Sequence, residues 1–282
     1  MNSTVLAQAR SLLFVPGDRP QRFDKALASA AGAVILDLED AVAPQDKALA
    51  RAHVGDCLRR ATPAQRERLL VRINASDVGG TPDHVEDLRL LQELRGHTPA
   101  GIVLPKAADP AVLAVVAEAA GEGVALLPLI ESAEGWAQAD ALARAPGVLR
   151  LVFGHLDFQL DMGMTADEAQ SELTPVRLSL VAASRRAGLV LPVDGVTPDV
   201  SDLAACEADT LRARRLGFGA RLCIHPQQVA VVHAGLAPTA EERAWAGRVL
   251  AAHEQTGEGA FRFEGRMVDA PVLAHARRLL LP

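Results

Sequence analysis

Apolar residues recur along the chain in short runs, many of them rich in β-branched side chains. A short apolar run bounded by polar or turn residues predicts a strand that is buried on both faces. Eight such runs are present: Ser11–Val15, Ala33–Leu38, Leu69–Ile73, Gly101–Leu104, Val124–Ile130, Leu149–Phe153, Leu189–Val193 and Arg221–Ile224.

Stretches with helical spacing lie between these runs, and several of them open on Asp, Ser, Thr or Pro, as helices commonly do. They are Pro20–Ala30, Ala43–Arg60, Thr81–Leu94, Pro110–Ala120, Gly135–Arg144, Thr174–Ala187 and Asp199–Leu216. Regular alternation of strands with helices predicts a parallel sheet, and a count of eight favours closure into a (β/α)8 TIM barrel. The long connection Gly154–Leu173 is interpreted as an active-site loop.

The character of the chain changes after the eighth strand. We therefore predict a catalytic barrel over residues 1–226 and a C-terminal helical extension, or lid, over residues 227–282. Thr239–Glu242 is a capping box that opens a helix reaching to about His253, and Asp269 precedes a last helix. That helix carries apolar residues that need a partner surface, on the barrel or on a neighbouring subunit: Val272, Leu273, Ala276, Leu279 and Leu280. A homo-oligomer, a trimer or hexamer, is expected.

Composition narrows the class of protein. The 282 residues are 49% hydrophobic and carry a net charge of -6, so there is no basic excess for neutralising nucleic-acid phosphates. The N-terminus has no signal pattern, and no apolar stretch approaches the roughly 18 residues of a membrane span. We expect a cytoplasmic protein that acts on small molecules, without a nucleic-acid or membrane partner.

Two carboxylates stand at the ends of neighbouring predicted strands. Glu131 follows the fifth apolar run, and Asp157 follows the sixth. Because the active site of a barrel lies at the carboxyl ends of its strands, these side chains are expected to converge there. Ligation by oxygen atoms alone suits Mg²⁺ or Mn²⁺, with waters and a substrate completing the octahedron. The alternative is that both residues cap helices or pair with loop arginines.

A cation and three acids stand at the ends of strands two and three. Arg72 is placed to clamp a carboxylate or polarise a carbonyl, and a buried ion pair with Asp37 or Glu39 is almost equally favoured. Alternation along the strand puts Asp37 and Glu39 on one side and leaves Asp40 in the loop. At least one of these acids is expected to order Arg72, Lys106 or a metal-bound water. Arg72 and Asp40 are candidate catalytic residues, and Arg72, Glu39 and Glu131 are candidate substrate-binding residues.

Lys106 follows the fourth strand and is one of three lysines in the chain. A barrel lysine can form a Schiff base, but the acidic surroundings favour a protonated amine that makes a salt bridge or binds an anion. Lys106 is therefore a candidate substrate-binding residue. His155 and His225 also stand at strand ends, where a hydrogen-bonded structural role is the ordinary one.

Motifs along nearly the whole chain resemble the citrate lyase beta subunit and the related malyl-CoA and citramalyl-CoA lyases. They are Leu12–Gly17, Ile35–Val42, Val71–Asn74, Leu104–Lys106, Leu129–Ser132, Phe153–Asp157, Ile224–Gln227 and Met267–Pro271. The resemblance implies a (β/α)8 barrel, Mg²⁺ held by Glu131 and Asp157, and Arg72 in contact with the 2-oxo acid product. It also implies that Asp269 enters a neighbouring subunit's site as a catalytic acid or base. One departure is visible, because many relatives carry an acid where this chain has Leu156.

The resemblance implies a Mg²⁺-dependent carbon–carbon lyase. Such an enzyme cleaves a 3-hydroxyacyl-CoA, for example malyl-, citramalyl- or citryl-CoA, into a 2-oxo acid such as oxaloacetate and an acyl-CoA, or joins them in a Claisen-type condensation. Three alternatives remain at this point. They are the lyase subunit of a citrate lyase complex that uses an acyl carrier protein thioester, a thioesterase of the malyl-CoA type, and a non-catalytic barrel scaffold. Without the resemblance, Asp269 would be interpreted as an ordinary helix cap.

Overall fold

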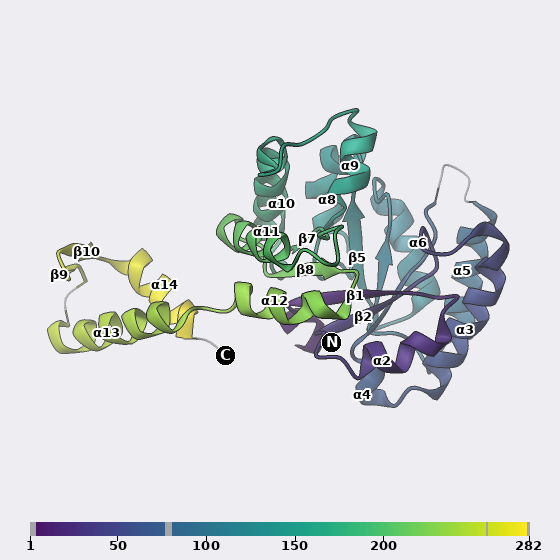
Figure 1. Cartoon of the computed structure of the whole chain (residues 1–282), viewed down its shortest axis with the longest axis horizontal. Coiled ribbons are helices and arrows are strands. Elements are labelled where there is room, and N and C mark those ends of the chain that lie inside the picture. The colour runs from purple at the N-terminus through teal and green to yellow at the C-terminus, as the bar shows by residue number, and fades with distance from the viewer. Residues whose placement is uncertain (1–3, 77–80, 258, 281–282) are drawn as a thin grey trace. The chain divides into compact units, whose positions relative to one another are not determined.

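The computed structural model describes residues 4–76, 81–257 and 259–280, which form two units, Met1–Leu236 and Ala237–Pro282 (Figure 1). In the first unit eight parallel strands close into a barrel, in which each strand pairs with the next and β8 pairs with β1. The strands are β1 Ser11–Pro16, β2 Ala33–Asp37, β3 Leu69–Arg72, β4 Gly101–Leu104, β5 Ala125–Ile130, β6 Val152–Phe153, β7 Val193–Asp194 and β8 Ala220–Cys223. The predicted (β/α)8 barrel is confirmed.

Helices follow the strands and lie outside the sheet (Figure 1). The α-helices of the first unit are α1 Thr4–Gln8, α2 Phe23–Leu27, α3 Lys47–Arg60, α4 Pro63–Arg66, α5 Pro82–Glu93, α6 Pro110–Ala120, α7 Ala133–Ala137, α8 Ala139–Arg144, α9 His155–Asp161, α10 Thr174–Arg186, α11 Leu203–Leu216 and α12 Pro226–Leu236. Short 3-10 turns, η1 Pro20–Arg22, η2 Pro44–Asp46 and η3 Ser171–Leu173, precede α2, α3 and α10.

The prediction of a continuous loop over Gly154–Leu173 was wrong. Its first part forms α9, which begins directly after β6, and its last residues form η3. Sequence periodicity is a weak signal in a helix as short as α9, so the helix was missed. As a consequence, Asp157 stands in the first turn of a helix rather than in a loop.

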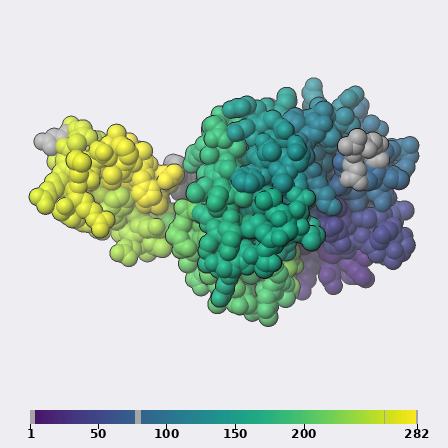
Figure 2. Space-filling view, turned by 90° about the horizontal axis from the view of Figure 1, so that it is seen from above, coloured from purple at the N-terminus to yellow at the C-terminus, as the bar shows by residue number. Residues whose placement is uncertain are grey.

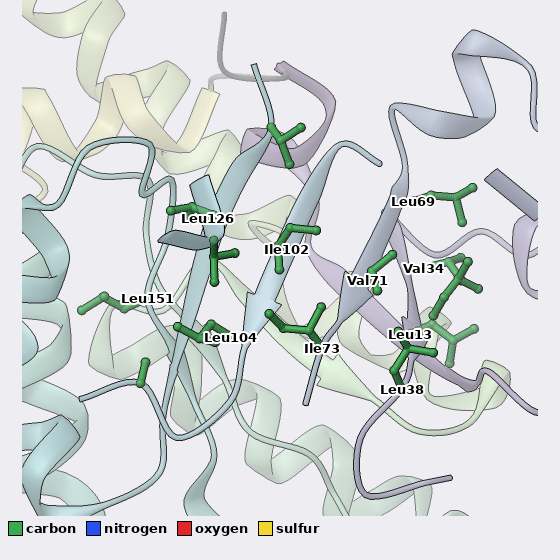
Figure 3. Packing of buried hydrophobic residues seen from close by; sticks show 14 of the residues in the cluster. Leu13, Val34, Leu38, Leu69, Val71, Ile73, Ile102, Leu104, Leu126 and Leu151 are labelled. Carbon is green, nitrogen blue, oxygen red and sulfur yellow. The ribbon is translucent and has the colours of Figure 1, made fainter. Parts of the chain in front are cut away.

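Alternation along the strands divides the buried residues of the barrel into two layers. One set faces outward against the helices, and Figure 3 shows part of it, including Leu13, Leu69 and Leu104. The other set fills the barrel interior and includes Leu12, Ile35, Leu70, Val103 and Leu127. Successive side chains of a strand point to opposite faces, so residues two positions apart share a layer. In the space-filling view, the surface of this unit is continuous from the purple to the green segments (Figure 2).

The second unit contains α13 Ala240–Thr256, a hairpin of β9 Phe261–Phe263 and β10 Arg266–Val268, and α14 Ala270–Leu280. The capping box predicted at Thr239–Glu242 is formed. The unit begins one helix later than predicted, because α12 packs on α11 and on the barrel strands β8 and β1. None of the helices in residues 4–76, 81–257 and 259–280 is long and apolar enough to cross a membrane.

The apolar face of α14 is covered within its own unit, which corrects the expectation that it needs the barrel or a neighbouring subunit. Leu273, Ala276 and Leu279 are buried against side chains of α13 and of the hairpin, and Val272 is partly buried there. Leu280 is 40% exposed. The sequence showed that the face needs a partner, but a partner in the same short unit satisfies the same pattern.

Candidate active site

Strand alternation carries three charged side chains into the mouth of the barrel. Asp37 and Arg72 continue the inward-facing positions of β2 and β3, and Glu131 continues those of β5. Asp37 and Arg72 are direct partners in the parallel register of β2 and β3. All three residues are buried, with exposed fractions of 0%, 9% and 4% respectively. They stand at the carboxyl ends of their strands, where active sites of barrels are built.

Arg72 forms the predicted ion pair with β2. Its Nε and Nη2 donate to the two carboxylate oxygens of Asp37, each over 2.6 Å, which is the bidentate geometry of a strong charge-assisted pair. Its Nη1 lies 2.8 Å from Glu39 Oε2 and 3.6 Å from Asp40 Oδ2. Burial by itself would lower the pKa of Arg72, but the hydrogen bonds and charge of Asp37, with Glu39 and Asp40, raise it. The guanidinium is therefore a permanent cation that is fixed by Asp37, and Arg72 lines a cavity at this end of the barrel.

The ionised form of the Glu39 carboxylate is destabilised by its surroundings. Burial, with the neighbouring acids Asp40 and Asp37 and despite Arg72, raises its pKa to about 7. Its backbone N–H donates to Asp37 Oδ1 over 3.0 Å, which fixes the turn after β2. Oε2 lies close to Arg72 but receives no hydrogen bond from the residues that the structure describes. The Glu39 carboxylate therefore stabilises the Arg72 guanidinium by electrostatic attraction rather than by a directional hydrogen bond.

Lys47 was not singled out by the sequence, although it holds this turn in place. Its Nζ is buried and donates to the carbonyl oxygens of Leu38 and Glu39, over 2.7 and 2.8 Å, and to Asn74 Oδ1 over 2.7 Å. Asn74 in turn donates from its backbone and side-chain nitrogens to Asp87. A helical lysine among polar residues usually extends its amine into solvent. The buried role of Lys47 is therefore visible only from its tertiary contacts.

Glu131 is the most strongly perturbed acid of the site. Its Oε1 accepts from the backbone N–H of Lys106 over 2.7 Å, and Lys106 adopts a positive φ of 49° there. Burial, followed by the charges of Glu39 and Asp157, raises the pKa of Glu131 to about 8. Such a shift indicates a buried carboxylate with too little positive charge nearby. A cation beside it removes that penalty.

The Lys106 side chain is exposed and makes no ion pair with the residues that the structure describes, so the predicted salt bridge is absent from that part of the chain. Its backbone, rather than its amine, contacts the site.

Asp157 and His155 come from the first turn of α9. Asp157 is partly exposed and lines the cavity together with Glu131. His155 is buried, and burial lowers its pKa to about 4, so the imidazole is neutral at pH 7. A Cβ atom on Gly195 would lie 2.1 Å from His155 Nδ1, so this position has room for the histidine only because residue 195 is glycine. His225 accepts a hydrogen bond from the Gln227 N–H instead and lines an adjoining cavity.

Two cavities meet at this end of the barrel. The first has a volume of about 340 Å³ and is lined by Asp37, Asp40, Arg72, Glu131, Asp157 and apolar residues. The second, of about 800 Å³, shares Phe14, Ala41 and Ile224 with it. Arg22 and Lys25 line the second cavity. An acidic chamber therefore adjoins a larger chamber that carries two cations.

Glu131 and Asp157 are the candidate donors for the predicted Mg²⁺. Among the described residues no group of three or more His, Cys, Asp or Glu side chains is arranged around one point. Glu131 and Asp157 nevertheless provide two carboxylates that face one cavity, and Glu131 Oε1 is the oxygen engaged by Lys106. Mg²⁺ is commonly bound through one or two carboxylates and keeps several waters. The residues fit Mg²⁺, with positions left for water and substrate.

Asp269 belongs to the second unit, directly before α14. Its Oδ1 accepts from the Val272 N–H over 3.4 Å, and its carbonyl oxygen accepts from the Leu273 N–H. Within its own unit the residue is thus a helix cap, as the sequence alone suggested.

Comparison with known proteins places the chain in a family. Residues 10–226 match the HpcH/HpaI aldolase/citrate lyase family, and a citrate lyase subunit beta-like protein of Mycobacterium tuberculosis is 40% identical over 95% of this chain and 93% of its own length. The chain belongs to this family. The HpcH/HpaI assignment agrees with the resemblance drawn from the motifs.

Other members of the HpcH/HpaI family are similar over the same length. The L-malyl-CoA/beta-methylmalyl-CoA lyase of Cereibacter sphaeroides is 35% identical over 95% of this chain and 92% of its own length. Among solved structures, CitE of M. tuberculosis in complex with magnesium, acetoacetate and coenzyme A has a TM-score of 0.83 and 37% identity, covering 97% of both chains. A CitE complex with magnesium and pyruvate from the same organism has a TM-score of 0.77 and 31% identity, covering 99% of this chain and 100% of the other.

Proposed function

We propose that this chain is a Mg²⁺-dependent carbon–carbon lyase that cleaves a 3-hydroxyacyl-CoA into a 2-oxo acid and an acyl-CoA, or joins them by Claisen-type condensation. Malyl-, citramalyl- and citryl-CoA are the candidate substrates. The observation that carries the proposal is the convergence of Arg72, Glu131 and Asp157 on one cavity at the carboxyl end of the barrel. The lyase names of its relatives and the magnesium and coenzyme A in the CitE complex support it.

Glu131 and Asp157 are the proposed ligands of Mg²⁺. When bound, the ion lowers the pKa of the substrate hydroxyl and stabilises negative charge on the carbonyl oxygen that forms from it. The burial of Glu131 and the repulsion from Glu39 and Asp157 explain why a cation is favoured here, because each makes the uncompensated carboxylate costly.

Arg72 is proposed to orient the 2-oxo acid through Nη1, which Asp37 does not bind and which lies beside Glu39 and Asp40. Asp37 and Glu39 hold the cation in place, so little ordering is needed when a substrate carboxylate arrives. Asp40 has a side chain that is 60% exposed in the same cavity, where it is available to move a proton. The exposed amine of Lys106 is proposed to attract the anionic substrate.

The adjoining cavity is proposed to hold the CoA part of the substrate. Arg22 and Lys25 supply positive charge for phosphate groups, and Leu13 and Ile224 add apolar surface. Because the two cavities share Phe14, Ala41 and Ile224, a thioester lying across this boundary reaches the acidic chamber.

We further propose a homo-oligomer, most simply a trimer, in which Asp269 of one subunit enters a neighbour's site and acts as the base or acid. The support is the resemblance to the family, since Asp269 within its own unit is a cap. Its Oδ1 accepts from the Val272 N–H over 3.4 Å, which is longer than an ordinary N–H···O hydrogen bond.

The deciding experiment is a product assay of the purified chain with malyl-, citramalyl- and citryl-CoA. We expect a 2-oxo acid and an acyl-CoA, full loss of activity with EDTA, and recovery with Mg²⁺. Borohydride added with a 2-oxo acid should trap no adduct on Lys106, because a metal ion rather than an imine is proposed to activate the carbonyl of the 2-oxo acid. Release of free CoA without a 2-oxo acid would indicate a thioesterase. Activity only with an acyl carrier protein thioester would indicate a citrate lyase subunit. Absence of activity in every assay would indicate a non-catalytic scaffold.

Gly154 gives a second test of the metal site. A Cβ atom there would lie 2.5 Å from Glu131 Oε2 and 2.8 Å from its Cβ, so Gly154→Ala must displace the carboxylate. We expect Mg²⁺ affinity to fall by about tenfold or more, the range seen when the support of a metal ligand is removed. Gly247→Ala is the matched control, because nothing lies within 4 Å of a Cβ at that helical position. Equal Mg²⁺ affinity in the two variants would contradict the assigned role of Glu131.

A further inference from the structure

His155 is supported from behind by a network of buried hydrogen bonds. A Cβ atom on Gly195 would lie 2.1 Å from His155 Nδ1, so the imidazole packs directly against the Gly195 backbone. The Gly195 N–H donates to Asp194 Oδ1 over 2.9 Å, and the Gly195 carbonyl oxygen accepts from Arg221 Nη2 over 2.9 Å. Asp194 Oδ1 also accepts from Nε of the buried Arg177 over 3.0 Å. The surface on which the imidazole rests is therefore fixed on both sides of residue 195.

The imidazole has hydrogen-bonding capacity that the described residues leave unused. His155 is 2% exposed and lines the acidic chamber, the cavity that also contains Arg72 and Glu131. Its hydrogen bonds with described residues involve its backbone, whose carbonyl oxygen accepts from Gln159. Neither ring nitrogen is among the fully enclosed polar atoms that lack a partner, so the ring nitrogens reach open space. Because Nδ1 lies beside Gly195, Nε2 is the nitrogen that faces away from it.

Hydrogen-bond donors are scarce in the acidic chamber. Apart from carboxyl groups, Arg72 and His155 are the two side chains of the described residues that line it and can donate. Asp37 occupies two donors of Arg72, and the rest of that guanidinium is proposed to orient the 2-oxo acid. Burial lowers the pKa of His155 to about 4, so at neutral pH its ring carries one N–H donor. That donor has no assigned role.

The proposed reaction creates an anion that needs a donor. In the cleavage direction a base takes the hydroxyl proton, and the bond between the hydroxyl-bearing carbon and the thioester α-carbon breaks. The electron pair of that bond moves onto the thioester and gives an enolate, whose negative charge rests on the former carbonyl oxygen. Protonation of the α-carbon then yields the acyl-CoA. Arg72 and the proposed Mg²⁺ ligands act on the 2-oxo acid half, whereas the enolate oxygen belongs to the other product. A fixed donor stabilises such an oxygen most where charge develops.

We propose that His155 is a further catalytic residue, whose Nε2–H donates a hydrogen bond to the thioester carbonyl oxygen and stabilises the enolate formed there. This inference rests on the proposed lyase function and deepens it. His155 transfers no proton in this role, because its hydrogen bond strengthens as negative charge develops on the oxygen. A neutral imidazole adds a donor to the acidic chamber without adding a cation that would pair with the carboxylates there.

An unreactive mimic of the enolate distinguishes this role from a structural one. Carboxymethyl-CoA carries an anionic carboxylate beside its sulfur, whereas acetyl-CoA carries a neutral carbonyl there. In calorimetry with the full chain and Mg²⁺, we expect His155→Phe to weaken carboxymethyl-CoA binding by about tenfold or more and acetyl-CoA binding by less than about twofold. His155→Gln, which keeps an amide N–H donor, should recover most of the affinity. Equal effects on the two ligands, or no effect on carboxymethyl-CoA, would overturn the proposal.

Kinetics provide a second measurement. We expect His155→Phe to lower kcat for cleavage by about 100-fold, the effect of removing one oxyanion donor, with little change in KM. His97→Phe is the matched control, because His97 is exposed in the loop before β4 and should leave kcat unchanged. Mg²⁺ affinity shows whether a variant disturbs the nearby Asp157. If His155→Phe loses Mg²⁺ affinity, His155→Leu replaces it as the variant without a donor, and equal kcat values of His155→Leu and His155→Gln would overturn the proposal.

The two levels of inference fail in different ways. If the unchanged chain cleaves none of the CoA esters and binds no 2-oxo acid in the presence of Mg²⁺, the lyase function is wrong and the role of His155 falls with it. If the unchanged chain cleaves an ester and His155→Phe cleaves it with the same kcat, the lyase function stands and the role of His155 alone is wrong.

Discussion

Glu131→Gln is expected to abolish lyase activity and to weaken Mg²⁺ binding by at least tenfold, while the barrel stays folded. The change removes the charge that holds the ion but keeps the shape of the side chain and its contact with the Lys106 N–H. Asp157→Asn is expected to act in the same direction. Calorimetric titration with Mg²⁺ measures the affinity, and thermal unfolding measures the fold.

Glu134→Gln is the matched control, because Glu134 is exposed in α7 three residues after the proposed ligand. It should bind Mg²⁺ as the unchanged chain does. Unchanged Mg²⁺ affinity in both Glu131→Gln and Asp157→Asn would end the metal-site interpretation.

The stability of the folded chain and its Mg²⁺ binding are both expected to depend on pH. The pKa of Glu131 is raised to about 8 and that of Glu39 to about 7 from an ordinary value near 4.5. Between pH 4.5 and 8 the folded chain therefore retains protons that the unfolded chain releases, so without a cation its stability falls as the pH rises through this window. Below pH 4.5 both states are protonated and the effect vanishes.

Mg²⁺ binding at pH 7 should therefore release protons, because the ion requires ionised carboxylates. Calorimetry in two buffers with different ionisation enthalpies measures the number released. We expect the release to be largest near neutral pH, to disappear above the raised pKa of Glu131 and to shrink in Glu131→Gln. If Mg²⁺ binding at pH 7 takes up protons, or neither releases nor takes up any, Glu131 is not the ligand whose raised pKa the structure indicates.

Mixing two inactive variants should restore activity if the site is shared between subunits. Subunits with Glu131→Gln keep Asp269, and subunits with Asp269→Asn keep Glu131. Random exchange at equal amounts leaves about a quarter of the shared sites with both residues intact, so up to about a quarter of the activity of the unchanged protein is expected. Asn keeps the capping of α14, so loss of activity in Asp269→Asn cannot be attributed to a lost helix cap.

Subunit exchange must be demonstrated independently, for example by mass analysis of a tagged variant. Glu131→Gln mixed with Asp157→Asn is the matched control, because both residues lie in the same cavity of one chain and exchange restores no site. Zero activity in the first mixture after proven exchange would show that Asp269 is a cap or acts within its own chain.

The sequence by itself determined the barrel and which residues of the candidate site lie at one of its ends. Buried parallel strands appear as continuous apolar runs, and eight of them alternating with helices have one common closed arrangement. Because the carboxyl ends of all strands meet at one face, Arg72, Glu131 and Asp157 could be assigned to one site without coordinates. The two-residue period of strands likewise placed Asp37 and Arg72 on the inner face.

Only the tertiary structure decided what each charged group contacts. Sequence reasoning left Arg72 free to bind a substrate or an acid, and the register of β2 with β3 selects Asp37. Lys47 and Gly154 acquire their roles from residues that are distant in sequence. Lys47 donates a hydrogen bond to Asn74, and Gly154 lies close to the side chain of Glu131. Likewise, an apolar stripe on α14 indicates burial but not the surface that buries it. Local patterns fix the layer in which a side chain lies, whereas its partner depends on distances that exist only after the chain has folded.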